Sequence, residues 1–399
     1  MKKSAFSPGK ILMRILGILL ILLFLLLAGA VFLWHNELFS IQSIHLEEER
    51  DDSREAGAVY SMHISGDYYF DDFLQQGGAK SDGELIDFIT SKIAKGLIPM
   101  HIENSKIGCS AFTASTPQGE RLFARNYDLK KTNTMVVFTD PGKGRHKSIS
   151  TVDLKFLSID PDTGIAGLKN KILCLAAPYA PLDGVNDAGV SCGIFMSYQG
   201  ETTVPTDMNT EKPDLTSTTM LRLILDYADS VEEAIDLVQQ YDLHDSAQTS
   251  YHYMVADASG KSAVLEWVAG TDATDNDGGN RTLSVLFHEP SPEDNFQIVT
   301  NYILTPGYYE GVPEQEMHGY DRLMKLQTSL EEDQGVVKNE EKAMGLLASV
   351  GRRSWNNDPK NSITVHSVVY NLAQRTVYWV GNENYGVSEH HFVWPQMQP

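Results

Sequence analysis

The sequence predicts an α+β domain in which strands and helices come in blocks. Three observations support this prediction. Short apolar strand patterns follow one another after residue 108, helical patterns then occur in pairs, and strand patterns return near the C-terminal end. A doubly wound parallel sheet would require a regular alternation of strands and helices, which this chain lacks. The pattern therefore favours a layered α+β architecture.

The first feature along the chain is an unbroken apolar stretch at 15–34, long enough to cross a bilayer as a helix. Lys and Arg residues precede it within 1–14, and acidic residues follow it at 47–52. This asymmetry predicts a cytoplasmic N-terminus and a single-pass protein of the cell membrane with an extracellular catalytic domain. A cleaved signal peptide is the alternative, because the small residues at 28–30 resemble a cleavage site, although signal cores are usually shorter.

Three further segments are expected. The polar residues 35–56 form an acidic spacer, residues 57–108 a helical prosegment, and residues 109–399 the catalytic domain. The clearest helical pattern of the prosegment is DGELIDFITSKIAKGL, where apolar residues recur at helical spacing. Turn residues then separate the short strands CSAFTAS, RLFARNYDL, TMVVFTD and SISTVDLKFL.

The rest of the chain supplies the helical block and the returning strands. GVSCGIFMSY predicts a buried strand, and two helices follow in TSTTMLRLILDYA and SVEEAIDLVQQY. Ser230 is the expected N-cap of the second helix, with Glu233 completing a capping box. YHYMVADASGKSAVLEWV predicts a hairpin and FQIVTNY another strand. Helices are expected in GYDRLMKLQTSL and NEEKAMGLLAS, and a hairpin in ITVHSVVYNLAQRTVYWVG is expected to close the chain.

Composition excludes several classes of partner. The 399 residues are 42% hydrophobic, which allows a sizeable core. The formal net charge is -21, with no basic stripe, which argues against binding of nucleic acid or anionic headgroups. A small molecule that is neutral overall or carries an apolar acyl part fits better. A homo-oligomer is left open.

The cysteines and histidines suggest no cofactor and no metal site. Three cysteines without CxxC spacing exclude a disulfide framework and a cysteine-rich zinc site. Cys174 and Cys192 lie in apolar runs and are expected in the core. The pair at 390–391 has no partner at metal-ligand spacing, and the pair at 244–245 has no GxSxG elbow beside it.

Four short motifs carry residues with catalytic chemistry. They are Gly108-Cys109-Ser110 at the start of a strand, ARNYD at 124–128, DGVN at 183–186 and Thr300-Asn301. Each is ordinary alone, since Gly-Cys can be a turn before a buried residue and ARNYD can hold a strand-end ion pair. DG and Asn are common turn residues. The order of the four motifs is what indicates a site.

Together these motifs resemble the choloylglycine hydrolase superfamily of N-terminal-nucleophile hydrolases. In that family an N-terminal Cys precedes (G/A)RNxD, DGxNExGL-like and TN segments, and the resemblance here covers roughly 109–385. It implies a four-layer αββα sandwich of two antiparallel sheets. It also implies hydrolysis of a linear, non-peptide C–N amide in a small N-acyl substrate. Asp187 departs from the pattern, because the family often has Glu there.

The resemblance implies that Cys109 is the nucleophile and that the Gly108–Cys109 bond is cut by the chain itself. Cleavage would free the α-amino group of Cys109, whose pKa of roughly 7.7–8 suits a base near neutral pH. That amine could then take the thiol proton, because only the thiolate attacks an amide carbonyl. While Gly108 is attached, the same nitrogen is an amide and cannot act as a base.

Roles for the other site residues also follow from the resemblance. Asp128 would hold the α-amine, and Arg125 would lie near the thiol, where a cation favours the thiolate. Asn186 and Asn301 would stabilise the oxyanion, each donor typically being worth about 10²–10³ in rate. The family also carries a later Arg on a helix. The residues implied for the site are thus Cys109, Arg125, Asp128, Asn186, Asn301 and Arg322.

Some alternatives remain open. Arg322 in GYDRLMKL is the best match for the late Arg, and the pair at 352–353 is the alternative. An acyltransferase of the same superfamily, passing the acyl group to an amine, would use the same residues. A membrane-anchored binding protein on a catalytically silent scaffold is the third possibility, favoured by the divergent flanks of Arg322 and by Asp187.

Overall fold

Two β-sheets form the centre of the protein, and the computed structural model describes residues 8–93, 108–198, 204–269, 278–309, 313–353 and 362–395. In this part of the chain the larger sheet has nine strands in the order β1-β2-β5-β6-β7-β8-β11-β12-β13. Their bounds are β1 (His45–Glu48), β2 (Val59–Ser65), β5 (Thr134–Asp140), β6 (Ser148–Asp153), β7 (Asp183–Asn186), β8 (Ser191–Met196), β11 (Tyr251–Ala256), β12 (Ser262–Ala269) and β13 (Arg281–His288).

The smaller sheet has six described strands in the order β14-β3-β4-β15-β16-β17. They are β14 (Ile298–Val299), β3 (Gly108–Ser115), β4 (Arg121–Leu129), β15 (Ile363–Asn371), β16 (Thr376–Gly381) and β17 (His391–Pro395). β3 contacts β8 of the larger sheet, so the two sheets pack face to face. A separate short pair joins β9 (Asp214–Thr216) to β10 (Asp242–His244) in parallel.

Helices cover the outer faces of both sheets. α6 (Ser217–Tyr227) contacts β7 and β8, and α7 (Val231–Val238) contacts β11. On the other side, α8 (Tyr320–Glu332) contacts β3 and β14, and α9 (Glu340–Ser349) contacts β4 and β15. The order helices, large sheet, small sheet, helices confirms the predicted mixed α+β architecture.

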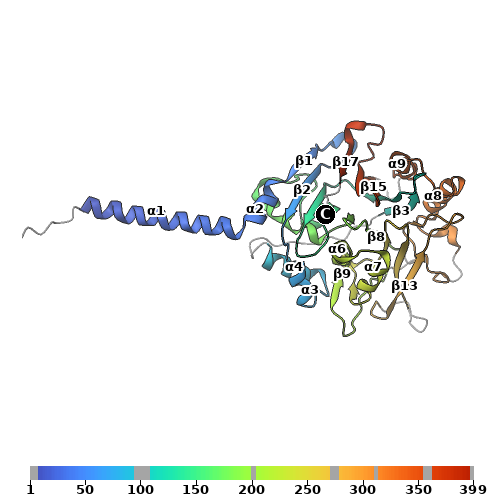
Figure 1. Cartoon of the computed structure of the whole chain (residues 1–399), viewed down its shortest axis with the longest axis horizontal. Coiled ribbons are helices and arrows are strands. Elements are labelled where there is room, and N and C mark those ends of the chain that lie inside the picture. Colours follow the sequence, from blue (N-terminus) through green and yellow to red (C-terminus); the bar gives the residue numbers. More distant parts are fainter. Residues whose placement is uncertain are drawn as a thin grey trace, which may run out of the picture.

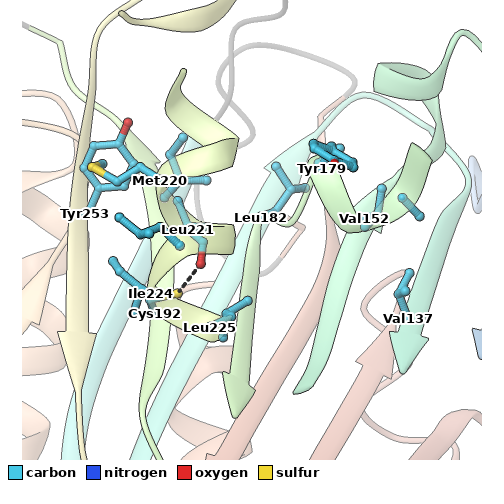
Figure 2. Close-up of a cluster of buried hydrophobic side chains, with 14 of the residues drawn as sticks. Val137, Val152, Tyr179, Leu182, Cys192, Met220, Leu221, Ile224, Leu225 and Tyr253 are labelled. Carbon is cyan, nitrogen blue, oxygen red and sulfur yellow. Dashed lines mark hydrogen bonds between the residues drawn. The ribbon is translucent and has the colours of Figure 1, made fainter. Parts of the chain in front are cut away.

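Apolar spacing explains how α6 packs on the larger sheet. Met220, Leu221, Ile224 and Leu225 recur at helical intervals and are buried against the strands (Figure 2). Cys192 of β8 lies beneath this helix, with its Sγ 3.9 Å from the carbonyl oxygen of Leu221. Cys192 and Cys174 are both buried, as their apolar flanks predict.

The N-terminal cap of α7 differs slightly from the predicted capping box. The Ser230 hydroxyl accepts the Glu233 N–H at 3.2 Å, as expected. The Glu233 carboxylate, however, accepts the N–H of Asp229, one residue before the cap. The motif therefore marks the start of the helix correctly, but its second hydrogen bond is shifted by one residue.

The strand β2 corrects the expectation that residues 57–107 are helical. β2 pairs in parallel with β5, Val59 standing opposite Thr134, so the larger sheet is not purely antiparallel. Met62 and Ile64 are buried while His63 and Ser65 are exposed, a two-residue period typical of a strand. The helical prediction is confirmed farther on, for α3 (Phe70–Gln75) and α4 (Asp82–Lys92), and the end of the predicted pattern lies outside the described residues.

The expected polar spacer carries ordered structure. α2 (His35–Gln42) packs on β2, and β1 pairs with β2 in antiparallel register. Sequence reasoning also omitted β13, and β17 follows the hairpin that was expected to close the chain. These strands lie at or next to sheet edges, where half-exposed positions weaken the apolar pattern.

The helix α1 (Pro8–Leu33) extends away from the body, at the left of Figure 1. Its described apolar side chains are exposed, Leu26 at 71% and Phe32 at 77%. No helix is long and apolar enough to cross a membrane when only described residues are considered. The structure therefore does not show the transmembrane segment predicted at 15–34.

Candidate active site

The pairing of β3 with β4 brings Cys109 and Arg125 onto one face of the smaller sheet. Cys109 stands opposite Tyr127, and Ala111 stands opposite Arg125. Opposite residues of an antiparallel pair share a face, so the thiol and the guanidinium meet. Arg125 Nη2 donates to Cys109 Sγ at 3.6 Å, and both side chains are buried.

Arg125 is held from three sides. Its Nη1 forms a close ion pair with Asp183, its Nη2 also donates to the Ile194 carbonyl oxygen at 2.6 Å, and its guanidinium lies over the Phe195 ring. Asp183 in turn accepts His366 Nε2 at 2.8 Å. A planar guanidinium fixed in this way keeps a positive charge beside the sulfur.

Asp183 belongs to the DGVN motif and is paired with Arg125, a contact that the sequence did not predict. Burial alone would raise the pKa of its carboxyl, but His366 and Arg125 outweigh burial and hold that pKa below its usual value. The Tyr370 hydroxyl donates to the same carboxylate at 2.6 Å. The signal available in the sequence was the position of DGVN directly before the predicted buried strand GVSCGIFMSY, where an unpaired Asp would be costly if buried.

Asn301 and Arg322 surround the backbone of Cys109. The Cys109 N–H donates to Asn301 Oδ1 at 2.8 Å, and Arg322 Nη2 donates to the same oxygen at 2.7 Å. Arg322 Nη1 donates to the Cys109 carbonyl oxygen at 2.5 Å. The amide donor of Asn301 is bound to the Met196 carbonyl oxygen at 2.8 Å.

The structure also distinguishes among Arg322, Arg352 and Arg353, the three candidates for the arginine that the family carries late in the chain. Arg322, in the first turn of α8, donates to the carbonyl oxygen of Cys109. Arg352 is buried but donates from Nε to the Ser362 hydroxyl, and Arg353 pairs with Glu383. Arg322 is therefore the one of the three that lies against Cys109.

Asp128 faces the peptide bond in front of Cys109. Its Oδ1 accepts the Thr364 hydroxyl at 2.7 Å, whereas its buried Oδ2 has no hydrogen bond within the described residues. The cation that reaches Oδ2 is Arg322 Nη1, at 3.5 Å. Burial raises the pKa of Asp128 against the opposing effects of Arg322 and Thr364. Oδ2 is therefore a buried acceptor without a hydrogen-bond donor among the described residues.

The surroundings of Cys109 favour the protonated form of its thiol. Burial raises the pKa of Cys109 to about 11, although the Arg125 guanidinium opposes this shift. At neutral pH the thiolate fraction is then very small, and attack on a carbonyl requires a base. No His contacts the sulfur among the hydrogen bonds of the described residues.

Asn186 lies away from this cluster, contrary to the expectation that it stabilises the oxyanion. Its Nδ2 donates to the Ala228 carbonyl oxygen at 2.8 Å, at the end of α6. Its Oδ1 accepts the N–H groups of Ala188 and Val190. The two bonds to Oδ1 close the β7–β8 turn and the third ties this turn to the end of α6, so the hydrogen bonds of the side chain indicate a structural role.

An apolar cavity of about 50 Å³ lies beside Arg125 and Tyr127. Its walls come from α4, from the short helices at 154–157 and 174–179, and from β8 and β11. The apolar residues that line it are Leu85, Ile86, Ile89, Phe156, Leu157, Ala176, Tyr179, Ala180, Leu182, Ile194, Met196, Ala247 and Tyr251. Apart from Arg125, its polar side chains are hydroxyls, so the cavity suits an apolar group.

Part of the chain matches a known protein family. Residues 109–274 match the family described as "Linear amide C-N hydrolases, choloylglycine hydrolase family". The predicted resemblance to choloylglycine hydrolases is confirmed. The match begins at Cys109, the residue that sequence reasoning chose as nucleophile. It also confirms the predicted enzyme class, a hydrolase of carbon–nitrogen bonds in linear amides.

Solved structures with a similar chain course include conjugated bile acid hydrolase from Clostridium perfringens, at 15% identity and a TM-score of 0.47. That alignment covers 72% of this chain and 92% of the hydrolase. Penicillin V acylase from Agrobacterium tumefaciens aligns at 15% identity and a TM-score of 0.42, over 68% and 83% of the two chains. The Caenorhabditis elegans ortholog of N-acylethanolamine-hydrolyzing acid amidase aligns at 14% and 0.41, over 66% and 93%. At these values the likenesses carry no conclusion about substrate. A search of curated proteins finds no significant match.

Proposed function

We propose that this protein is a membrane-anchored, extracytoplasmic hydrolase that uses Cys109 as an N-terminal nucleophile on the linear amide of an N-acyl substrate. The observation that carries the proposal is the contact between Cys109 Sγ and Arg125 Nη2, with Asn301 and Arg322 bound to the same residue's backbone. A cation at the sulfur and fixed donors around the adjoining peptide are the parts that acyl transfer through a thiol requires.

Activation begins with cleavage of the bond between Gly108 and Cys109. The thiol adds to the Gly108 carbonyl, the C–N bond breaks, and the acyl group passes to sulfur as a thioester while the nitrogen gains the proton. Water then hydrolyses the thioester, releasing the Gly108 carboxylate and the Cys109 thiol. The unfilled Oδ2 of Asp128 supports this step, because the new α-ammonium would supply the missing donor.

The cleaved enzyme repeats the same chemistry on its substrate. The α-amine takes the thiol proton, the thiolate attacks the amide carbonyl, and the amine product leaves with a proton returned from the α-ammonium. Water completes the turnover by releasing the acid. Asn301 is the proposed oxyanion donor through Nδ2, and Arg125 stabilises the thiolate. Asn186 has no part in this scheme.

The apolar cavity supports an N-acyl substrate with an apolar acyl group. It begins at Arg125, so an acyl chain inside it would leave its carbonyl near the sulfur. Leu85, Ile86 and Ile89 of α4 belong to its wall although they precede the cleavage point. The segment before Cys109 is thus proposed to remain part of the active enzyme.

Membrane attachment is proposed through α1. Its support is the uninterrupted apolar sequence at 15–34, the exposed apolar side chains of the helix, and its course away from the body (Figure 1). Basic residues precede the stretch and acidic residues follow it, which favours an outward-facing body. Fractionation of cells into membrane and soluble protein, with and without residues 1–34, tests this part separately.

Mass spectrometry of the purified protein tests the central proposal. Wild type is compared with Cys109→Ala, and a fragment that begins at Cys109 is expected in the wild type alone. A panel of bile acid conjugates, penicillin V, N-acyl ethanolamines and N-acyl amino acids then tests amide hydrolysis. Intact wild-type chain together with activity that survives Cys109→Ala would refute the mechanism.

A further inference from the structure

A buried ion pair lies behind the loop that carries Asn301. His252 of β11 and Glu266 of β12 are cross-strand neighbours, and His252 Nδ1 lies 2.9 Å from Glu266 Oε1. Both side chains are fully buried in the larger sheet. Burying a charged pair costs free energy unless each of its polar atoms forms a hydrogen bond. The hydrogen-bond partners of His252 and Glu266 therefore indicate the role of the pair.

The contacts indicate an imidazolium facing a carboxylate. His252 Nε2 donates to the Thr300 carbonyl oxygen at 2.9 Å, so this nitrogen carries a proton. Glu266 accepts the N–H groups of Leu304 and Thr305, each at 2.8 Å, and the Thr305 hydroxyl at 2.7 Å. A carboxylate that accepts this many donors is ionised, and the proton between the two residues then belongs to Nδ1.

His252 and Glu266 form hydrogen bonds with the two ends of the segment 300–305. His252 holds residue 300, Glu266 holds residues 304 and 305, and Asn301 lies between them. Asn301 is the residue whose Oδ1 accepts the Cys109 N–H and whose Nδ2 lies on the Met196 carbonyl oxygen. Movement of either end of the segment would shift Asn301 relative to the sulfur.

We propose that His252 and Glu266 are positioning residues that fix the 300–305 segment and so aim Asn301 at the reacting carbonyl. The proposal rests on the proposed function of Cys109 and Asn301. Among the described residues, neither side chain has a hydrogen bond to the thiol or belongs to the cavity lining, and their hydrogen bonds reach Asn301 through the backbone of the segment. The His252 ring also packs edge-on against Phe195, the ring beneath the Arg125 guanidinium. A displacement near 1 Å at a reacting group can cost about 100-fold in rate, which sets the scale of the expected loss.

The test uses His252→Gln, Glu266→Gln and the double variant in the full chain, with kcat and KM measured on an N-acyl amide that the wild type hydrolyses. The single variants are expected to lower kcat about 10- to 100-fold, with KM changed far less. Because the residues act as a pair, the double variant should lose no more than the worse single variant. Unchanged kcat in folded single variants, or a loss confined to KM, would overturn the proposal.

Two further variants complete the test, one a milder change at the same contact and the other a control. Thr305→Val removes one hydroxyl donor to Glu266 without leaving an unpaired buried charge, so it tests the proposal even if the variants of His252 and Glu266 do not fold. It is expected to lower kcat less than those variants would. His288→Gln removes an imidazole from β13, opposite Ser262 and four residues along β12 from Glu266. This control should leave kcat unchanged, and a loss equal to that of His252→Gln would contradict the assignment.

Amide hydrogen exchange tests the positioning role of Glu266 independently of the proposed catalytic function. In Glu266→Gln the amides of Leu304 and Thr305 should exchange faster than in the wild type, and exchange requires no substrate. Protection that stays unchanged overturns the positioning role even in an active enzyme. Faster exchange in a protein whose wild type hydrolyses no amide would instead refute the proposed function.

Discussion

The carboxylate of Asp128 lies so close to the backbone of Gly108 that a side chain at residue 108 would require the carboxylate to shift by a few tenths of an ångström. A Cβ placed on Gly108 would lie 3.0 Å from Asp128 Oδ2, the carboxylate oxygen that accepts no hydrogen bond from the part of the chain that the structure describes. The two residues stand opposite each other in the β3–β4 register. An unfilled acceptor therefore lies beside the bond whose cleavage would create a new ammonium group.

Asp128→Asn is expected to impair both self-cleavage and turnover while the protein stays folded. The amide oxygen can still accept the Thr364 hydroxyl, but the variant has no charge to hold the α-ammonium. General acid–base groups typically contribute about 10²–10⁴ in rate, and a loss at the lower end of this range is expected. Mass spectrometry follows cleavage, and kcat/KM follows turnover. Equal cleavage and equal kcat/KM in the variant would remove Asp128 from the mechanism.

Asn301→Ala and Asn186→Ala should have opposite effects. Asn301→Ala is expected to lower kcat about 10²- to 10³-fold, as loss of an oxyanion donor does. Asn186→Ala should leave kcat near that of the wild type but lower the free energy of unfolding by about 1–3 kcal/mol, because buried turn amides lose their partner. Urea unfolding and initial rates on both variants decide between these roles. A large kcat loss for Asn186→Ala in a stable protein would restore it to the site.

Asp183 links the stability of the site to pH. Its folded-state pKa is lowered, so its contribution is fully present above the unfolded pKa of about 3.9 and is lost as pH falls through the folded value. Asp183→Asn should therefore be less stable than the wild type at pH 7, and the difference should narrow below about pH 4. Urea unfolding at pH 7, 4 and 3 measures it. A difference that is constant over this range would contradict the ion pair with Arg125.

The sequence could predict the strands that run through the core and the residues in the ordered motifs. Cys109, Arg125, Asp128, Asn301 and Arg322 meet because β3, β4, β14 and α8 adjoin in space. Asn186 was predicted as an oxyanion donor because DGVN contains two polar side chains and the sequence does not show which of them faces the site. In the structure Asp183 pairs with Arg125, whereas Asn186 binds the backbone around the β7–β8 turn.

Other features could not be predicted because they depend on tertiary pairing. β2 is only seven residues long, and its parallel partner β5 lies far along the chain, so the local pattern gave no sign of the pairing. The pairing of His252 with Glu266 depends on the register of the β11–β12 hairpin. Their link to residues 300–305 crosses between sheets and has no local signature.

The pieces produced by cleavage at Gly108 are expected to stay together without a covalent bond. β2 is an interior strand of the larger sheet, so its departure would leave the edge of β5 unpaired. Buried polar contacts add to this, since the Tyr68 hydroxyl donates to Asp226 at 2.5 Å and Arg145 pairs with Asp67 at 2.8 Å. Size-exclusion chromatography of the cleaved protein should give one peak with both pieces in native buffer and two peaks in denaturant. Arg145→Ala should weaken the association, whereas Lys212→Ala, an exposed residue outside this contact, should not. Separation of the wild-type pieces in native buffer would show that the N-terminal segment is released, and the cavity wall formed by α4 would then be absent from the active enzyme.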